Sequence, residues 1–134
     1  MKSEKYIKNK YGEFRIEGDM AFVHLVSGIH VDMKTAQDLI RIKEELLEGT
    51  FYPVLAYVHG HHSSDKAARD FLAHKPEGTA GITAAACIAP SVFARIFLNA
   101  FIHLSRPPIP IRLFESEAPA IRWLKKFVPK EELV

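Results

Sequence analysis

Histidines gather in one short stretch of the chain and are the first residues that could do chemistry. His59, His61 and His62 fall within four positions, and imidazole is the commonest metal ligand in proteins. A zinc ion takes four ligands in a tetrahedral arrangement. The residues around Gly60 share no helical face, and no cysteine lies near enough to complete a set. We therefore expect no metal and no other cofactor, and we treat His59, His61 and His62 as a candidate ligand-lining loop.

Motifs for covalent catalysis or nucleotide binding are missing from the sequence. Cys87, the one cysteine, lies in an apolar segment of small residues, where a thiol lacks the exposure and positive surroundings that make it reactive. The patterns G-x-S-x-G, G-x-G-x-x-G and G-x-x-x-x-G-K-S/T are absent. No pair of acidic residues is set apart for acid–base work. These observations favour a protein that is not an enzyme, with a small enzyme as the weakest alternative.

One expected helix, 91–104, is apolar on two sides. Stepped at 3.6 residues per turn, the side that we expect to face the core carries Phe93, Phe97 and Phe101. The opposite side carries Arg95, Leu98 and Ile102. A helix that is apolar on both sides has a neighbour on each. These three residues are therefore a candidate interaction face for a protein, a second copy or a lipid, and cover by the loop 106–110 or by the N-terminal arm is the alternative.

Strand and helix signals alternate along the chain and predict the elements that position these residues. Alternating or apolar runs predict strands over 11–17, 20–26, 53–59, 79–89 and 111–114. Apolar residues at helical spacing predict helices over 33–48, 64–74, 91–104 and from Ser116 onward. Gly18-Asp19 is a turn signal, so the first two strands form an antiparallel hairpin, whereas strands separated by helices favour parallel pairing. The expected fold is α/β, with a mixed, mostly parallel five-stranded sheet and four helices in the order β-β-α-β-α-β-α-β-α.

Length and composition indicate one globular domain. The chain has 134 residues, 48% of them hydrophobic and 25% charged, which is ordinary globular composition. Lysine plus arginine exceeds acid by only two, too weak a balance to indicate nucleic acid as a partner. Residues 1–10 are rich in lysine and read as a disordered or frayed basic arm rather than a secretory signal. We expect a single domain over 11–134 and a cytoplasmic location.

A stretch between Gly78 and Ser105 is apolar enough to be weighed as a membrane span. Its one formal charge is Arg95, which would lie near the centre of the bilayer at a cost of about 2.5 kcal/mol or more. Pro90 interrupts the run, and a spanning helix needs about 20 apolar residues. We therefore expect a buried strand, a break and a helix, and no membrane span.

The order and lengths of the elements resemble the STAS fold of bacterial anti-sigma-factor antagonists, also called SpoIIAA-like. The C-terminal half is similar to an uncharacterised bacterial family of small STAS-like domains. The segments that carry this similarity are residues 64–69, reading SDKAAR, and residues 106–124, reading RPPIPIRLF followed by ES and EAPAIRWL. The element order covers nearly the whole chain, whereas these segments cover about a fifth of it. They indicate the fold rather than an activity.

The resemblance implies a possible regulatory role for two serines, Ser63 and Ser64, at the expected start of the second helix. In anti-sigma-factor antagonists a serine there is phosphorylated, which stops binding of a partner kinase. The Asp-Ser-Ser-Gly pattern of those proteins is absent, and Asp65 would repel a phosphate. Ser63 and Ser64 are therefore candidates for a phospho-acceptor or a helix cap, and we favour the cap.

Fold and motifs together favour a non-enzymatic binding or regulatory domain. The resemblance implies action through contact with a protein partner or with a second copy of the chain. The alternative is a module that binds a small apolar molecule or lipid, since STAS-related folds also take nucleotides and apolar ligands. A deep apolar pocket would favour the alternative, and a flat apolar helix face would favour the interaction domain.

Overall fold

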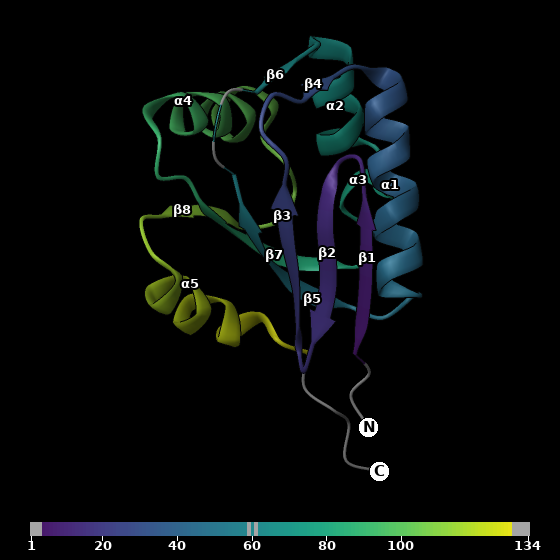
Figure 1. Cartoon of the computed structure of the whole chain (residues 1–134), viewed down its shortest axis with the longest axis vertical. Coiled ribbons are helices and arrows are strands. Elements are labelled where there is room, and N and C mark those ends of the chain that lie inside the picture. Colours follow the sequence, from purple (N-terminus) through teal and green to yellow (C-terminus); the bar gives the residue numbers. More distant parts are fainter. Residues whose placement is uncertain (1–3, 59, 61, 130–134) are drawn as a thin grey trace.

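The computed structural model describes residues 4–58, 60 and 62–129, which form an α/β fold around one main sheet (Figure 1). The strand order across this sheet is β1-β2-β3-β5-β7-β8. Its strands are β1 (Lys5–Asn9), β2 (Gly12–Glu17), β3 (Met20–Leu25), β5 (Tyr52–Tyr57), β7 (Ile82–Ile88) and β8 (Ile111–Phe114). A second, two-stranded sheet pairs β4 (His30–Val31) with β6 (Ser63–Ser64). The predicted α/β class is confirmed, with six strands in the main sheet instead of five.

The first three strands pair antiparallel with one another. β2 and β3 form the predicted hairpin around Gly18, whose φ of 63° suits a glycine in a tight turn. β1 pairs antiparallel with β2, so the prediction of a frayed basic arm over 1–10 is wrong for Lys5–Asn9. The reason is alternation, because Ile7 packs on the core while Tyr6 and Lys8 are exposed. Exposed lysines on an edge strand discourage pairing with another chain.

From β3 onward the strands are parallel and follow the order of the sequence, as predicted. Right-handed crossovers that always advance in one direction place their helices on one face of the sheet. On that face lie α1 (Met33–Leu47), α2 (Lys66–His74), α3 (Pro76–Thr79) and α4 (Val92–Ala100). α5 (Glu117–Leu124) covers the opposite face (Figure 1). Five helices replace the predicted four because Pro76–Thr79 forms a short helix of its own.

α1 begins and ends where the sequence predicts. The carboxylate of Asp32 accepts a hydrogen bond from the backbone N–H of Thr35 at 2.8 Å, which makes Asp32 the N-cap. This bond lowers the pKa of the Asp32 carboxyl. After the helix, Gly49 has a φ of 78°, a conformation that glycine adopts without strain. The inward face of α1 packs on β2 and β3 through Ile42, Leu46 and Leu47.

Small residues in β7 let helices approach the sheet from both faces. On one face, the buried alanines of β7 pack against Ala120 and Leu124 of α5. On the other face, Cys87 packs in one buried cluster with Ala94 and Leu98 of α4. Cys87 is buried, and burial raises the pKa of its thiol to about 12. The predictions of a strand within 79–89 and of a cysteine buried in the core are confirmed.

Two helices change type near their ends. α4 continues as a π-helical segment, η1 (Phe101–Ser105), after which Arg106 takes a left-handed φ of 48°. α5 continues as a 3₁₀ turn, η2 (Lys125–Phe127). The hydroxyl of Tyr57 on β5 donates to the Glu117 carboxylate at the start of α5. Burial, with help from this bond, raises the pKa of Tyr57 to about 12. Within residues 4–58, 60 and 62–129, every helix is too short or too polar to cross a membrane.

Candidate functional site

The short β4–β6 sheet brings together two loops that lie far apart in the sequence. β4 follows β3, and β6 follows β5, so both lie beyond the carboxyl ends of neighbouring parallel strands (Figure 1). In the parallel register His30 is opposite Ser63, and Val31 is opposite Ser64. The carboxyl edge of a parallel sheet is where α/β proteins commonly place their ligands. The polar residues of this edge are therefore the first candidate site.

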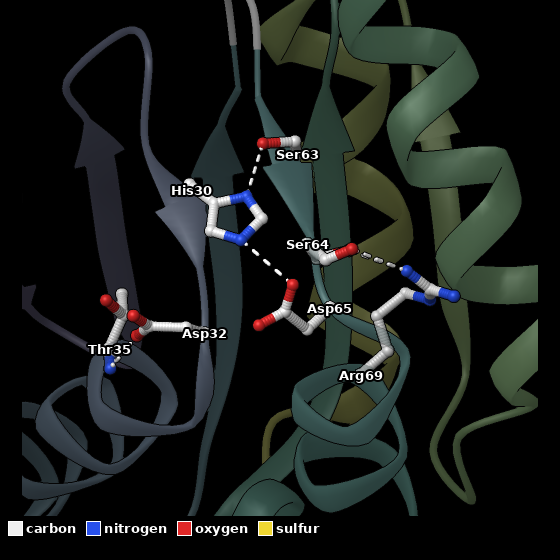
Figure 2. A network of polar contacts seen from close by, with 7 residues as sticks. All are labelled: His30, Asp32, Thr35, Ser63, Ser64, Asp65 and Arg69. Carbon is white, nitrogen blue, oxygen red and sulfur yellow. Dashed lines mark hydrogen bonds and ion pairs between the residues drawn. The ribbon is translucent and has the colours of Figure 1, made fainter.

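His30 is the centre of a polar network at this edge (Figure 2). Its Nδ1 lies 2.6 Å from the hydroxyl of Ser63, and its Nε2 lies 3.0 Å from a carboxylate oxygen of Asp65. Because an ionised carboxylate only accepts, Nε2 carries the proton in the neutral ring, and Nδ1 accepts from the Ser63 hydroxyl. The side chains of His30 and Asp65 are 52% and 55% exposed. Water competes for these bonds, so the network contributes little to stability.

Ser64 makes a separate contact on the other side of β6 (Figure 2). Nη1 of Arg69 donates to the Ser64 carbonyl oxygen at 2.9 Å and to its hydroxyl oxygen at 3.0 Å. α2 begins two residues later than predicted, with Asp65 at the N-cap position and no side-chain capping bond. The prediction that Ser63 or Ser64 caps this helix is therefore wrong. Both serines are held in β6 by pairing with β4, and their hydroxyls face His30 and Arg69 instead.

A serine, a histidine and an aspartate in contact can act as a nucleophile, a base and a group that orients the base. By the distances above, Ser63 would be the nucleophile, His30 the base and Asp65 the orienting group. Catalysis also needs a water-excluded site with donors for the developing charge. His30 and Asp65 are half-exposed, and neither cavity beside α1 is lined by any of the three. The arrangement is better suited to presenting a polar surface than to acyl transfer.

Of the three histidines in the predicted ligand-lining loop, the structure describes only His62. The ring of His62 is buried and lies 5.6 Å from the ring of Phe97 on α4, at an angle of 44°. His59 and His61 lie outside the described residues, so the predicted ligand-lining loop stays a prediction at those two positions. Among the residues that the structure describes, no three His, Cys, Asp or Glu side chains gather as metal ligands would.

The predicted interaction face of α4 is wrong in its orientation. Leu98 is only 7% exposed and packs beside Val58 and Cys87, while the guanidinium of Arg95 donates to the Ala89 carbonyl oxygen at 3.3 Å. Ile102 is half-buried. α4 carries large apolar residues on more than one side, so hydrophobicity alone could not fix which side faces the sheet. The small side chain of Ala94, together with Leu98, lets α4 approach the sheet, and the bulkier residues turn outward.

The outward side of α4 and η1 therefore carries the apolar surface. Val92, Ile96 and Leu104 are 59%, 62% and 72% exposed, and we call these three residues the α4 outer stripe. Phe93, which the sequence placed in the core, is also 59% exposed. Sequence reasoning missed this stripe, although it recognised the helix as apolar on more than one side.

Sequence reasoning also missed His30, because its partners are 33 and 35 positions away. Only the pairing of β4 with β6 brings them together, and no local pattern announces a two-residue strand. One further residue, Lys43, did carry a signal, because it occupies a position on the apolar face of α1 where the helical pattern calls for an apolar side chain.

Comparison with known proteins identifies the fold more clearly than the activity. The sequence profile of the domain of unknown function DUF7793 matches residues 14–128. The crystal structure of an uncharacterised protein of the DUF3478 family from Shewanella loihica PV-4, described as having a SpoIIAA-like fold, superposes with a TM-score of 0.55. The two chains share 13% sequence identity over 91% of this chain and 92% of the other. This likeness confirms the SpoIIAA-like fold. None of the curated proteins matches the chain.

Proposed function

We propose that this chain, which belongs to the DUF7793 family of domains of unknown function, is a binding domain that works by pairing with a second copy of itself. The observation that carries the proposal is the α4 outer stripe. Apolar side chains exposed singly are normal on protein surfaces. Val92, Ile96 and Leu104 instead lie on the outward side of a single helical segment at 59–72% exposure, alongside the exposed Asn99 and His103, and surface patches rich in apolar side chains mark interaction sites.

A second copy suits this surface better than a partner of different chemistry. Two-fold contacts place the same patch on both subunits, so the patch must be complementary to itself. An uncharged apolar stripe meets that condition, whereas a stripe with charges of one sign would repel its own copy. The one formal charge between Ser91 and Ser105 is Arg95, and its guanidinium is turned to the Ala89 carbonyl. Two α4 helices can therefore pack against each other without burying an unpaired charge.

The SpoIIAA-like fold supports contact between proteins as the mode of action. We propose that this contact serves a regulatory role and takes place in the cytoplasm. The polar edge around His30 lies on another part of the surface and is not needed for pairing. The proposal needs no catalytic step, and the side chains of His30 and Asp65 beside Ser63 are half-exposed.

Light scattering coupled to size-exclusion chromatography tests the proposal. The wild-type protein is expected to show a concentration-dependent dimer. Replacing two stripe residues by lysine, in Ile96→Lys plus Leu104→Lys, should give a monomer with almost unchanged melting temperature, because exposed positions contribute little to stability. Apolar residues at the centre of a small interface carry most of its binding energy, so the two changes should suffice.

The matched control is Phe51→Lys, which places a lysine at a residue that is 58% exposed and lies between α1 and β5. This variant should dimerise like the wild type. A wild-type protein that is monomeric at every concentration contradicts the proposal. A double variant that still dimerises would place the interface elsewhere and contradict it equally.

A further inference from the structure

A cavity of about 200 Å³ lies between α1 and the sheet, on the face that the connecting helices cover. Its walls come from β2, β3 and β5, from α1 and from α2, and they include Phe14, Ala21, Val23, Leu39, Val54 and Leu72. An engineered apolar cavity of about 150 Å³ stays dry and binds benzene. The cavity under α1 is therefore large enough for the apolar part of a small organic molecule.

Small residues create this space and keep it open. Ala21 on β3 is fully buried, and it faces the cavity with a methyl group where its neighbours carry larger side chains. Gly78 on α3 lies so close to α2 that a Cβ there would come within 1.9 Å of the Leu72 carbonyl oxygen. α3 can therefore close over this end of the cavity only with glycine at that position.

Among the residues that the structure describes, Lys43 is the one charged residue that lines the cavity. It lies on the inward side of α1, between Leu39 one turn before it and Leu46 and Leu47 one turn after. Its Nζ donates to the carbonyl oxygen of Glu77, and among the described residues no carboxylate lies within 4.0 Å of it. Partial burial lowers the pKa of Lys43. The charges of Glu44 and Glu77 partly offset this effect of burial. A half-buried ammonium without a carboxylate in direct contact would still gain a charge-assisted hydrogen bond from an anion.

A second, more polar cavity of about 320 Å³ adjoins the first, because Lys43 and Leu47 line both. Glu44 and Glu77 line this outer cavity but not the inner one. Their negative charges disfavour a dianionic group such as a phosphate near the mouth. A carboxylate carries a single charge and is compact, so it can reach Lys43 at lower electrostatic cost.

We propose that the inner cavity binds a small monocarboxylic acid, with its apolar tail among the side chains under α1 and its carboxylate on Nζ of Lys43. The tail removes apolar surface from water, and the carboxylate gives the buried ammonium a charged partner. This ligand site is separate from the α4 outer stripe, so it stands or fails independently of self-association.

Calorimetric titration with octanoate tests the site, with circular dichroism to confirm that each variant is folded. The wild-type protein should bind octanoate with a dissociation constant below about 1 mM. Lys43→Met keeps an unbranched apolar side chain and removes the charge, and it should weaken octanoate binding at least about tenfold, the loss of one charge-assisted hydrogen bond. Lys43→Arg, which keeps the charge, should retain most of the affinity.

Two further measurements separate the charge from the cavity. Lys125→Met removes the same charge from η2, beyond α5 on the opposite face of the sheet, and should leave octanoate binding unchanged. Octanol should bind wild type and Lys43→Met equally, because it has the tail without the charge. Octanoate that fails to bind the wild type, or that binds Lys43→Met as tightly as the wild type, overturns the proposal, as would tighter binding of octylamine than of octanoate.

Discussion

Ser63 and Ser91 both precede expected helices in the sequence, but only Ser91 caps a helix in the structure. The hydroxyl oxygen of Ser91 accepts a hydrogen bond from the Ala94 backbone N–H at 3.1 Å, so Ser91 is a true N-cap of α4. Ser63 contacts His30 on the exposed β4–β6 sheet. We predict that Ser91→Ala lowers the free energy of unfolding by about 1 kcal/mol. Ser63→Ala should lower it by less than about 0.5 kcal/mol.

Urea denaturation of the two variants measures both values. Ser91→Asp serves as the control, because aspartate caps helices about as well as serine. If Ser63→Ala costs as much as Ser91→Ala, the bond to His30 is stronger than its exposure indicates.

Asp38 on α1 makes part of the stability depend on pH. Its carboxylate accepts hydrogen bonds from the Tyr11 hydroxyl and, at 3.1 Å, from Nζ of Lys34. The Tyr11 bond, followed by the Lys34 bond, lowers the pKa of Asp38 below its ordinary value of 3.8. A carboxyl whose pKa is lower in the folded state contributes stability that is complete above its unfolded pKa and is lost as the pH falls through the folded value.

We therefore predict that unfolding between about pH 5 and pH 2 depends less on pH in Asp38→Asn than in the wild type. Tyr11→Phe, which removes only the first hydrogen bond, should fall between the two. Thermal melts across this range measure the slopes. Equal slopes for wild type and Asp38→Asn would mean that other carboxyls carry the acid dependence.

At the scale of elements, α4 shows most clearly that burial, rather than the hydrophobicity of a side chain, sets its contribution to stability. Leu98 is 7% exposed and Ile96 is 62% exposed, although both are large and apolar and stand two positions apart. We predict that Leu98→Ala lowers the free energy of unfolding by about 2–5 kcal/mol, the usual cost of emptying a packed site. Ile96→Ala should change it by less than about 0.5 kcal/mol.

Chemical denaturation of the two monomeric proteins, measured well below any dimer dissociation constant, gives the comparison. The reverse order, with Ile96→Ala the costlier change, would restore the orientation that the phenylalanine spacing suggests. It would also remove the basis of the α4 outer stripe.

The elements differ in how much of them can be predicted from local sequence. α1 has a cap, one apolar face and a terminal glycine, so its bounds and its inward side follow from the residues themselves. β1 was missed because its lysines resemble a solvated arm, and only pairing with β2 makes Ile7 a core residue. For α4 the sequence predicts the helix but not its rotation, because large apolar residues lie on more than one of its sides.

At the scale of the whole molecule, β5 joins three of the buried clusters. Leu55 belongs to the cluster under α5, Tyr52 to the one under α1, and Val58, just after the strand, to the one under α4. We predict that the protein unfolds in a single cooperative transition, since neither layer can separate without exposing part of β5. Small single domains usually behave in this way.

Two probes measured on one sample test this cooperativity. Trp123, the one tryptophan, packs between Phe114 and Phe127 on the α5 side, so its fluorescence reports on that layer. Far-ultraviolet circular dichroism reports chiefly on the helices of the other face. Coincident urea midpoints are expected, and an earlier fluorescence transition would mean that α5 detaches first.

The overall topology was predictable because the alternation of strands and helices extends along the chain, whereas the sites depend on contacts between distant segments. The Lys43 site could be predicted in part. Its misplaced charge can be read from the sequence, but the cavity beside it exists only when α1, α3 and the sheet come together.

The π-helical segment η1 has a consequence for how the length of this chain can vary. A π turn accommodates one more residue than an α turn with the same ends, so Phe101–Ser105 holds one residue beyond what a regular helix would need there. His103 is exposed within it. Deleting His103 would convert the bulge into ordinary α-helix while the start of α4 and the entry to β8 stay in place. Relatives one residue shorter here would then keep the same sheet, and the segment 101–105 is where an alignment should open its gap.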